Sequence, residues 1–322
     1  MTAIVIPVLD EADNIGELLD DCAAQEPPAD EVIVVDAGST DGTAEIVERR
    51  ASDWPALRLV RARGALPGAA RNAGIETARA DAIATLDAGS RVDPGWLAAI
   101  GAEVKGSEHR AAVGVCVADA HSDFERAAGF LTLRGFKPAH DRPAPLGRAF
   151  VPPGRNGYCF ARDAWERAGG YPAELPWGED KRFLERLRAA GTDVVVVPEA
   201  AVRWRPRRSL RDLYRQYRAY GRGDVLARID RQNELVPLAL YGTGAALAIG
   251  AIATGSAPAA LLLAAGAAGY LGLFTAPAAR ELGPGRSLAW VPVVRITADL
   301  AKIDGLVRAV AGRGLRPSGA AP

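Results

Sequence analysis

Acidic and basic side chains stand where predicted strands end and predicted helices begin. Asp36 closes one strand and Asp87 closes another, while Arg71 starts a helix and the adjacent Glu179 and Asp180 start a later one. Carboxylates can accept protons or hydrogen bonds, and the fixed charge and fork geometry of arginine suit phosphate groups. The alternative is that these acids only form turns and complement helix N-termini.

The elements that must position these residues follow from the apolar pattern of the first 200 residues. The apolar runs AIVIP, EVIVV, LRLV, AIATL and AAVGV alternate with helical patterns such as NIGELLDDCAA and GTAEIVERRA. This alternation predicts an α/β fold with a mainly parallel sheet and helices on both faces. Ligands of such sheets bind beyond the carboxyl ends of the strands, which is where the acids lie.

The overall composition argues against several classes of protein. The 322 residues carry 39 Lys and Arg against 39 Asp and Glu, so we expect no nucleic-acid binding through bulk positive charge. A hydrophobic fraction of 49% is ordinary for a folded protein. The three cysteines are far apart and predict neither a disulfide framework nor a thiolate metal site. The opening MTAIVIPVLDEADN lacks the basic segment of a secretory signal.

Residues 235–279 form a run of 45 residues without a charge, of which 16 are Ala and 7 are Gly. This length allows two membrane spans of about 20 residues each, joined by a turn at residues 255–258. Gly242, Ala246 and Gly250 repeat a small residue every fourth position, which favours close approach of two spans. The alternative is a pair of packed helices in a soluble protein.

The segment before this run is strongly basic, with ten arginines and three acids between residues 203 and 231. In a helix, Arg211, Arg215, Arg218 and Arg222 share one face. Such a face can bind anionic lipid or a phosphate-bearing substrate, and the sequence leaves both interpretations open.

Arginines flank both outer ends of the uncharged run, and its turn carries none, so we expect a transmembrane hairpin with both ends in the cytosol. After the hairpin, VPVVRITADLAKIDGLVRAV mixes charged with apolar residues. It is therefore predicted to lie along the membrane surface.

Four segments, taken in order, carry a resemblance to a known family. They are PVLDE, VVDAGSTDG, ARNAGIETARADAIATLDAGSRVDPGWL and VPPGRNGYCFARDAWERAGGYPAELPWGEDKRFLERLRAAG. Over roughly residues 3–225 the chain resembles family 2 glycosyltransferases of the GT-A fold. PEAAVRWRPRRSLRDLYRQYRAYGRG and RITADLAKIDGLV resemble a membrane-associated bacterial or archaeal subset. The resemblance implies an inverting transfer of a sugar from a nucleotide-sugar to a lipid-linked or membrane-proximal acceptor.

The resemblance also implies which residues bind the nucleotide-sugar: Pro7, Leu9, Glu11, Asp36, Arg71, Asp87 and Ala88. The family usually has an acidic pair, D-x-D, that binds a divalent metal, but this sequence reads Asp87-Ala88-Gly89 and lacks the second acid. Many relatives place a histidine ligand near the position of Trp204, where this sequence has none. Because Mg²⁺ can keep waters while touching one carboxylate and two phosphate oxygens, we expect Mg²⁺ or Mn²⁺ at Asp87.

Asp180 is predicted to be the catalytic base that takes the proton of the acceptor hydroxyl, and Glu179 is the next candidate. Trp177 precedes this pair and is either a sugar-stacking platform or a core residue. Arg155 and Asn156 are candidates for the donor-sugar or acceptor side.

We therefore predict four regions: a GT-A catalytic domain at 1–202, a basic interface region at 203–234, two transmembrane helices within 235–279, and an interfacial helix with a tail at 280–322. The predicted location is the cell membrane, with the catalytic domain in the cytosol. Two other functions remain open. A sugar-nucleotidyltransferase is disfavoured because the first loop lacks a glycine-rich, basic phosphate signature. The incomplete D-x-D leaves open a second alternative, a non-catalytic membrane protein that binds a nucleotide-sugar.

Overall fold

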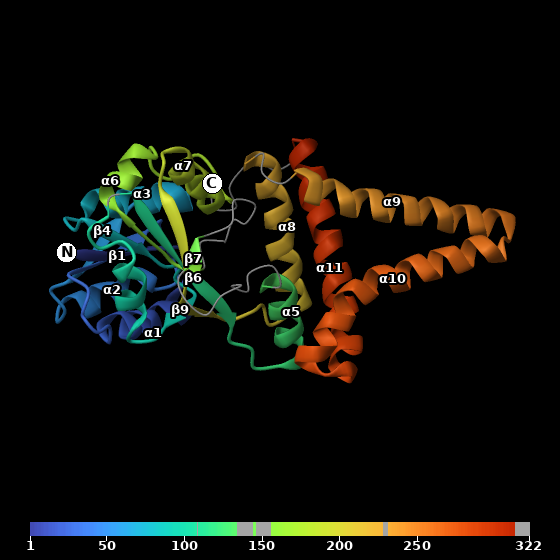
Figure 1. The fold of residues 1–322 in the computed structure, drawn as a ribbon, viewed down its shortest axis with the longest axis horizontal. Coiled ribbons are helices and arrows are strands. Elements are labelled where there is room, and N and C mark those ends of the chain that lie inside the picture. The colour runs from blue at the N-terminus through green and yellow to red at the C-terminus, as the bar shows by residue number, and fades with distance from the viewer. Residues whose placement is uncertain (108, 134–143, 146–155, 228–230, 313–322) are drawn as a thin grey trace. The chain divides into compact units, whose positions relative to one another are not determined.

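The computed structural model describes residues 1–107, 109–133, 144–145, 156–227 and 231–312. The chain divides into two compact units (Figure 1). The sheet unit contains the described residues of 1–119 and 135–205. The helical unit contains those of 120–134 and 206–320, so it includes a short segment from within the predicted catalytic region.

The first half of the sheet is parallel, as the apolar runs predict. Its strands lie in the order β3-β2-β1-β4, and each neighbouring pair is parallel. Their bounds are β1 (Thr2–Val8), β2 (Glu31–Asp36), β3 (Leu57–Arg61) and β4 (Ala82–Thr85). Asp36 ends β2 and Asp87 lies two residues beyond β4, so both acids lie at the carboxyl ends of these parallel strands.

The second half of the sheet is mixed, which the pattern of apolar runs does not predict. β8 pairs antiparallel with both β4 and β6, and β9 is parallel to β6 but antiparallel to β5 and β7. The bounds are β5 (Ser90–Val92), β6 (Arg110–Ala118), β7 (Ala144–Pro145), β8 (Tyr158–Ala161) and β9 (Asp193–Trp204).

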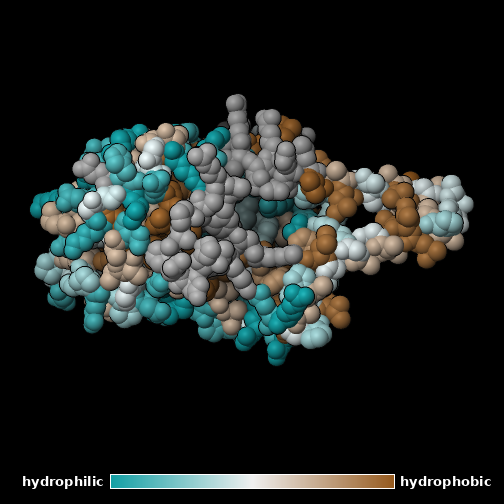
Figure 2. Space-filling model, in the orientation of Figure 1, coloured by the Kyte–Doolittle hydropathy of each residue, from teal (hydrophilic) through white to brown (hydrophobic). Residues whose placement is uncertain are grey.

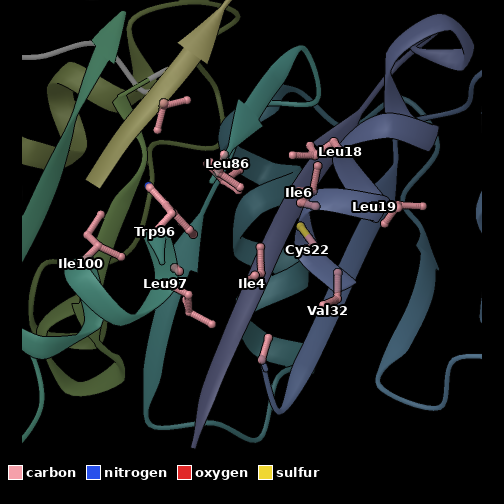
Figure 3. Packing of buried hydrophobic residues seen from close by; sticks show 14 of the residues in the cluster. Ile4, Ile6, Leu18, Leu19, Cys22, Val32, Leu86, Trp96, Leu97 and Ile100 are labelled. Atoms are coloured by element: carbon pink, nitrogen blue, oxygen red, sulfur yellow. The ribbon is translucent and has the colours of Figure 1, made fainter. Parts of the chain in front are cut away.

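Helices cover both faces of this sheet and produce two separate cores. Ile4 and Ile6 of β1 point to one face, where they pack with Leu18 and Trp96 (Figure 3). Val5 points to the other face because side chains alternate along a strand. Burial of each such aliphatic side chain contributes about 1.5–3 kcal/mol. The helices are α1 (Ala12–Ala23), α2 (Thr43–Ala51), α3 (Pro67–Thr77), α4 (Trp96–Ala102), α6 (Arg162–Arg167) and α7 (Glu179–Ala189).

The helical unit has a core of its own. Phe124, Leu213, Tyr217 and Val294 belong to its buried cluster, and Trp290 meets Phe124 edge-on with ring centroids 5.7 Å apart. Its helices are α5 (Asp123–Leu133), α8 (Leu210–Ala227), α9 (Arg231–Thr254), α10 (Ala257–Leu282) and α11 (Pro284–Val310).

α9 and α10 form an antiparallel hairpin whose side chains are largely apolar (Figures 1 and 2). Val236–Thr254 and Ala257–Leu282 are each long and apolar enough to cross a membrane, with a mean hydropathy of 1.7 and at most 6% of the window buried. The turn lies where the sequence predicts it, and Ser256 caps α10 by accepting from the amide of Ala259.

The small-residue repeat of α9 does not mark the contact between the two helices. A Cβ added at Gly242 or Gly250 would meet nothing within 4 Å. A Cβ at Gly244 would lie 3.8 Å from Leu263 of α10, so the contact involves a different face. The spacing of Gly242, Ala246 and Gly250 thus indicates a small-residue face, but this face does not join the hairpin.

Candidate active site

The loops that follow β1 and β2 are hydrogen-bonded to each other. The amide of Asp10 donates to Ser39 Oγ at 2.9 Å, and the amide of Thr40 donates back to Asp10 Oδ1 at 2.8 Å. The amide of Glu11 donates to Thr43 Oγ1 at 2.9 Å. These bonds fix the positions of the residues that the sequence assigns to the nucleotide base.

Within these loops, Asp36 is the buried acid. Its side chain is almost fully enclosed at the end of β2, and Oδ1 accepts from the amide of Ser39 at 3.0 Å. Pro7 is half-buried, and Glu11 is half-buried with its carboxylate accepting from Asn14 at 2.7 Å. Leu9 is 53% exposed, which leaves an apolar side chain at the surface beside these acids. Pro7, Leu9, Glu11 and Asp36 therefore combine acidic and apolar side chains at the carboxyl ends of β1 and β2.

Arg71 connects two carboxylates that are far apart in the sequence. Its Nη1 donates to Glu179 Oε1 at 2.6 Å, and its Nη2 donates to Asp87 Oδ1 at 2.6 Å. The Arg71 and Glu179 side chains are only 6% and 9% exposed, whereas Asp87 is 40% exposed. Both terminal nitrogens of Arg71, which the sequence assigns to the nucleotide, are therefore used by protein carboxylates.

The buried charges shift each other's proton affinity. Burial alone would lower the pKa of Arg71, but Asp87 and Glu179 raise it above its ordinary value. Burial raises the pKa of the Glu179 carboxyl, and the Arg71 guanidinium opposes that rise. Arg71 thus stays charged and holds both acids at fixed positions.

α3 also holds the segment that leads to α7. Asn72, next to Arg71, donates to the carbonyl of Tyr171 at 2.8 Å and accepts from its amide at 2.9 Å. A Cβ at Gly68 would lie 2.3 Å from the carbonyl oxygen of Pro172, so only glycine allows this approach. The Tyr171 ring stacks on Phe183 of α7 with centroids 3.8 Å apart. One face of α3 therefore sets the position of the α7 N-terminus.

α7 begins at Glu179, as the sequence predicts. Gly178 precedes it with a φ of 78°, a left-handed conformation that favours glycine. Asp180 is half-buried, and its Oδ1 accepts from the amide of Lys181 at 2.7 Å. After burial, the Asp180 charge is the next cause that raises the pKa of the Tyr158 hydroxyl. The charges of Asp180 and Arg71 therefore both act on the buried Tyr158 hydroxyl, Asp180 raising its pKa and Arg71 lowering it.

The acids in the described part of the chain do not form a preassembled metal cage. No three or more His, Cys, Asp or Glu side chains are grouped there so that they could hold a metal ion. Asp87 is accessible, and one of its oxygens is held by Arg71. A single oriented carboxylate fits a hard divalent cation that takes its other ligands from water and phosphate oxygens.

Comparison with known proteins identifies the family. Residues 3–161 match the family model of glycosyl transferase family 2. The sheet unit of the chain belongs to glycosyl transferase family 2. The matched segment includes Asp36, Arg71 and Asp87, whereas α7 with Glu179 and Asp180 lies beyond it.

Several relatives share longer or shorter parts of this glycosyl transferase chain. It is 26% identical over 258 residues to succinoglycan biosynthesis protein ExoA of Rhizobium meliloti (strain 1021), covering 76% of this chain and 78% of that protein. It is 38% identical over 91 residues to undecaprenyl-phosphate 4-deoxy-4-formamido-L-arabinose transferase of Pseudomonas fluorescens (strain Pf0-1), or 27% of each protein.

The fold agrees with that of a solved glycosyltransferase. Mannosyltransferase PcManGT from Pyrobaculum calidifontis, solved in complex with GDP-Man and Mn2+, has a TM-score of 0.68 at 24% identity. The comparison covers 97% of this chain and 88% of that one. It supports the GT-A architecture predicted for this family 2 domain.

The remaining predicted site residues have varied surroundings. Ala88, the residue after Asp87, is buried, and Trp177 is half-buried just before α7. Asn156 is buried and donates to the carbonyl of Gly114 at 3.0 Å, where the β6–β9 register shifts, while its Oδ1 has no hydrogen-bond partner among the described residues. Asn156 thus supports the sheet irregularity. Arg155 lies outside the described residues.

The arginine face of α8 belongs to the helical unit. Arg211, Arg215 and Arg218 are exposed and Arg222 is half-buried, while Leu213 on the opposite side is buried. The predicted amphipathic helix is therefore present, with three exposed arginines on one face and buried Leu213 on the other.

Sequence reasoning missed two residues that organise the site. Asn72 and Tyr171 connect α3 to the α7 segment, and Tyr171 contributes its ring 5.4 Å from the Arg71 guanidinium carbon. A signal was present, since Asn72 follows Arg71 directly and Tyr171 follows two glycines ahead of α7. The contacts themselves join residues about a hundred positions apart, which spacing does not reveal.

Proposed function

We propose that this chain is an inverting glycosyltransferase that moves a sugar from a nucleotide-sugar donor to a lipid-linked or membrane-proximal acceptor. The observation that carries the proposal is the Arg71 bridge between Asp87 and Glu179, each at 2.6 Å. A displacement needs charge control at the leaving diphosphate and a carboxylate for the acceptor proton. The bridge ties Asp87, the acid for the first task, to the start of α7, which also carries Asp180, the acid for the second task.

On the donor side, the surface formed by Pro7, Leu9, Glu11 and Asp36 would hold the nucleotide base. A carboxylate that accepts an N–H of the base discriminates against a base without one, because the buried acceptor would then stay unpaired. Asp36 suits this role because it is buried and fixed by the Ser39 amide. Ala88 would border the donor beside Asp87.

Asp87 would hold a divalent metal, Mg²⁺ or Mn²⁺. When bound, such an ion neutralises charge on the departing diphosphate. The chain's own contribution is orientation, since Arg71 fixes one oxygen of Asp87 and leaves the residue accessible.

On the acceptor side, Asp180 would take the proton of the attacking hydroxyl. Glu179, the other candidate, is less suited because its Oε1 already accepts from Arg71 and its side chain is buried. Asp180 is more accessible and starts the same helix. Trp177 and Arg155 would contribute to the sugar surface, whereas the contacts of Asn156 favour a supporting role.

The two long apolar helices support association with a membrane, and α9 and α10 would cross it with both outer ends in the cytosol. A relative whose name includes undecaprenyl phosphate supports a lipid-linked acceptor. The arginine face of α8 would then bind anionic lipid headgroups or the acceptor's phosphate.

A thermal-shift screen of nucleotide-sugars against the purified full-length chain, with and without Mg²⁺ or Mn²⁺, tests the donor part of the proposal. A ligand that binds the native state raises the melting temperature by mass action, and the metal should increase the shift. NMR of the product's anomeric proton then tests inversion. Retention of configuration would contradict the mechanism, and no shift with any donor would contradict nucleotide-sugar binding.

One observation favours a second function, a non-catalytic nucleotide-sugar-binding protein. Gly89 stands where the family has its second acid. Donor binding without either transfer or hydrolysis would support this alternative.

A further inference from the structure

α11 exposes bulky apolar side chains along one side. Val293, Ile296, Leu300, Val307 and Val310 are between 37% and 73% exposed. Their spacing of three, four, seven and three residues places them on one stripe of a helix, and the half-buried Ile303 fills the gap. We call these six residues the outer stripe.

The opposite face of α11 is buried, and its small residues pack closely on α8. A Cβ at Gly305 would lie 2.2 Å from the carbonyl oxygen of Arg218, and one at Gly221 would lie 2.3 Å from that of Lys302. Ala298 and Ala301 are buried on the same face. Helices of soluble proteins usually bury their bulky apolar residues and expose polar ones. α11 buries Val291 and Val294 near its start, but from Ile296 onward its buried positions are Ala298, Asp299, Ala301 and Gly305, while its bulky apolar residues stay partly exposed.

Two charged residues of α11, Asp304 and Lys302, contact α8. Asp304 accepts from the Tyr214 hydroxyl at 3.1 Å and lies 4.0 Å from Arg218, while Lys302 lies 3.8 Å from Asp224. The contact between Arg218 and Asp304 brings the arginine face of α8 next to the outer stripe. The resulting surface combines aliphatic side chains with positive charge.

The chain's own connectivity indicates what covers this surface. α11 begins two residues after α10 ends, and it lies across the base of the α9–α10 hairpin (Figure 1). A bilayer that contains the hairpin therefore meets α11 along its length. Aliphatic residues bordered by arginines match the boundary between acyl chains and anionic headgroups.

A second copy of the chain is the competing occupant, since the spacing of the outer stripe would also suit a helix pair. Such pairs use charges beside the apolar seam to select a partner. Asp299, which flanks Leu300, is instead buried and bound to Arg295 at 2.5 Å and to the Tyr270 hydroxyl at 2.5 Å. This flank offers no charge to a partner helix.

We propose that the outer stripe of α11 inserts into the headgroup boundary of an anionic membrane and forms, with the arginine face of α8, a lipid-binding surface separate from the two spans. The proposal rests on the proposed membrane association. It adds a second surface whose residues differ from those of the hairpin.

Site-specific fluorescence tests this surface in the full-length chain. Leu300→Cys and Val307→Cys place a probe in the outer stripe, Ile249→Cys places one on the exposed side of α9, and Glu76→Cys is the aqueous control. The three native cysteines are buried, so labelled wild-type protein provides the blank. Each labelled variant is reconstituted into phosphatidylglycerol and phosphatidylethanolamine vesicles and exposed to lipid-borne spin label or to aqueous iodide.

We expect the probes at 300 and 307 to be quenched several-fold more by spin label near the headgroups than by iodide, with the opposite result at 76. Iodide quenching at 300 and 307 together with lipid quenching at 249 would overturn the proposal and leave the spans intact. Lipid quenching at 300 with iodide quenching at 249 would keep the surface and reject the spans. Protection from both quenchers, with disulfide cross-links between copies at 300, would assign the stripe to a dimer and overturn the proposal.

Discussion

Replacing Arg71 with alanine should strongly destabilise the sheet unit, because it leaves a buried carboxylate without its partner. Glu179 is 9% exposed and Arg71 is 6% exposed, so this is a buried pair. Breaking such a pair by removing one member costs about 3–5 kcal/mol. Asp87 is 40% exposed and adds little, because water can solvate it. The expected loss is a large part of the roughly 5–15 kcal/mol that stabilises a typical domain.

Thermal unfolding followed by tryptophan fluorescence measures this loss. At about 2–4 °C per kcal/mol for a domain of this size, the melting temperature should fall by roughly 6–20 °C. Arg61→Ala is the matched control, since Arg61 also bonds a glutamate, at 2.5 Å, but both side chains are at least half exposed. Its melting temperature should stay close to that of the wild type.

A double variant separates the interaction between Arg71 and Glu179 from the effect of removing each side chain. In Arg71→Leu/Glu179→Leu no buried charge is left alone, so much of the lost stability should return. Equal melting temperatures for Arg71→Ala and Arg61→Ala would show that the buried Arg71–Glu179 pair does not stabilise the sheet unit. So would a double variant whose loss equals the sum of the two single losses.

Three further perturbations test other parts of the structure. Asp87→Ala should raise the donor KM and lower transfer together, and an EDTA-insensitive wild-type rate would exclude the metal role. The Ser209 hydroxyl lowers the pKa of Asp212, so this stabilisation of α8 is present above the ordinary pKa and lost as pH falls through the lowered one. Ser209→Ala should return the pKa of Asp212 toward its ordinary value in a carboxyl NMR titration. An unchanged pKa would contradict the hydrogen bond from the Ser209 hydroxyl to Asp212. Gly305→Leu should cost about 1–3 kcal/mol in chemical unfolding because its Cβ would meet an α8 backbone oxygen at 2.2 Å. Gly285→Leu, with open space around it, should cost much less, and equal losses would argue against the close α8–α11 contact.

The parallel half of the sheet and the places of its acids were predictable from the sequence. Apolar runs ending in Asp36 and a helix starting at Glu179 are local signals, and β2 ends and α7 begins at the predicted residues. Two neighbouring predictions were wrong, because Arg71 lies within α3 rather than at its start and Asp87 lies two residues beyond the end of β4. The antiparallel β8 was not predictable, because strand direction is set by tertiary packing rather than by side-chain alternation. The same holds for α5, whose Phe124 packs in the helical unit although it lies between two strands of the sheet unit.

The contacts within the candidate site needed the structure. Arg71 reaches partners 16 and 108 residues away, and nothing in the local sequence indicates which anion its guanidinium binds. A phosphate and a carboxylate satisfy the same fork geometry. The small residues of α9 were ambiguous in a similar way, because glycine spacing shows where helices can approach but not which face makes the contact. Gly244 faces Leu263 of α10, whereas Gly242, on the predicted face, has open space around it.

Sugar transfer by the full-length chain in vesicles tests the central claim most directly. A panel of nucleotide-sugars is offered with a lipid-linked sugar that carries a free hydroxyl, and wild type is compared with Asp180→Asn. We expect transfer by the wild type and at least about a 10²-fold lower rate in Asp180→Asn with donor binding unchanged. Donor binding by the wild type without transfer or hydrolysis, or an Asp180→Asn rate close to that of the wild type, would contradict this claim.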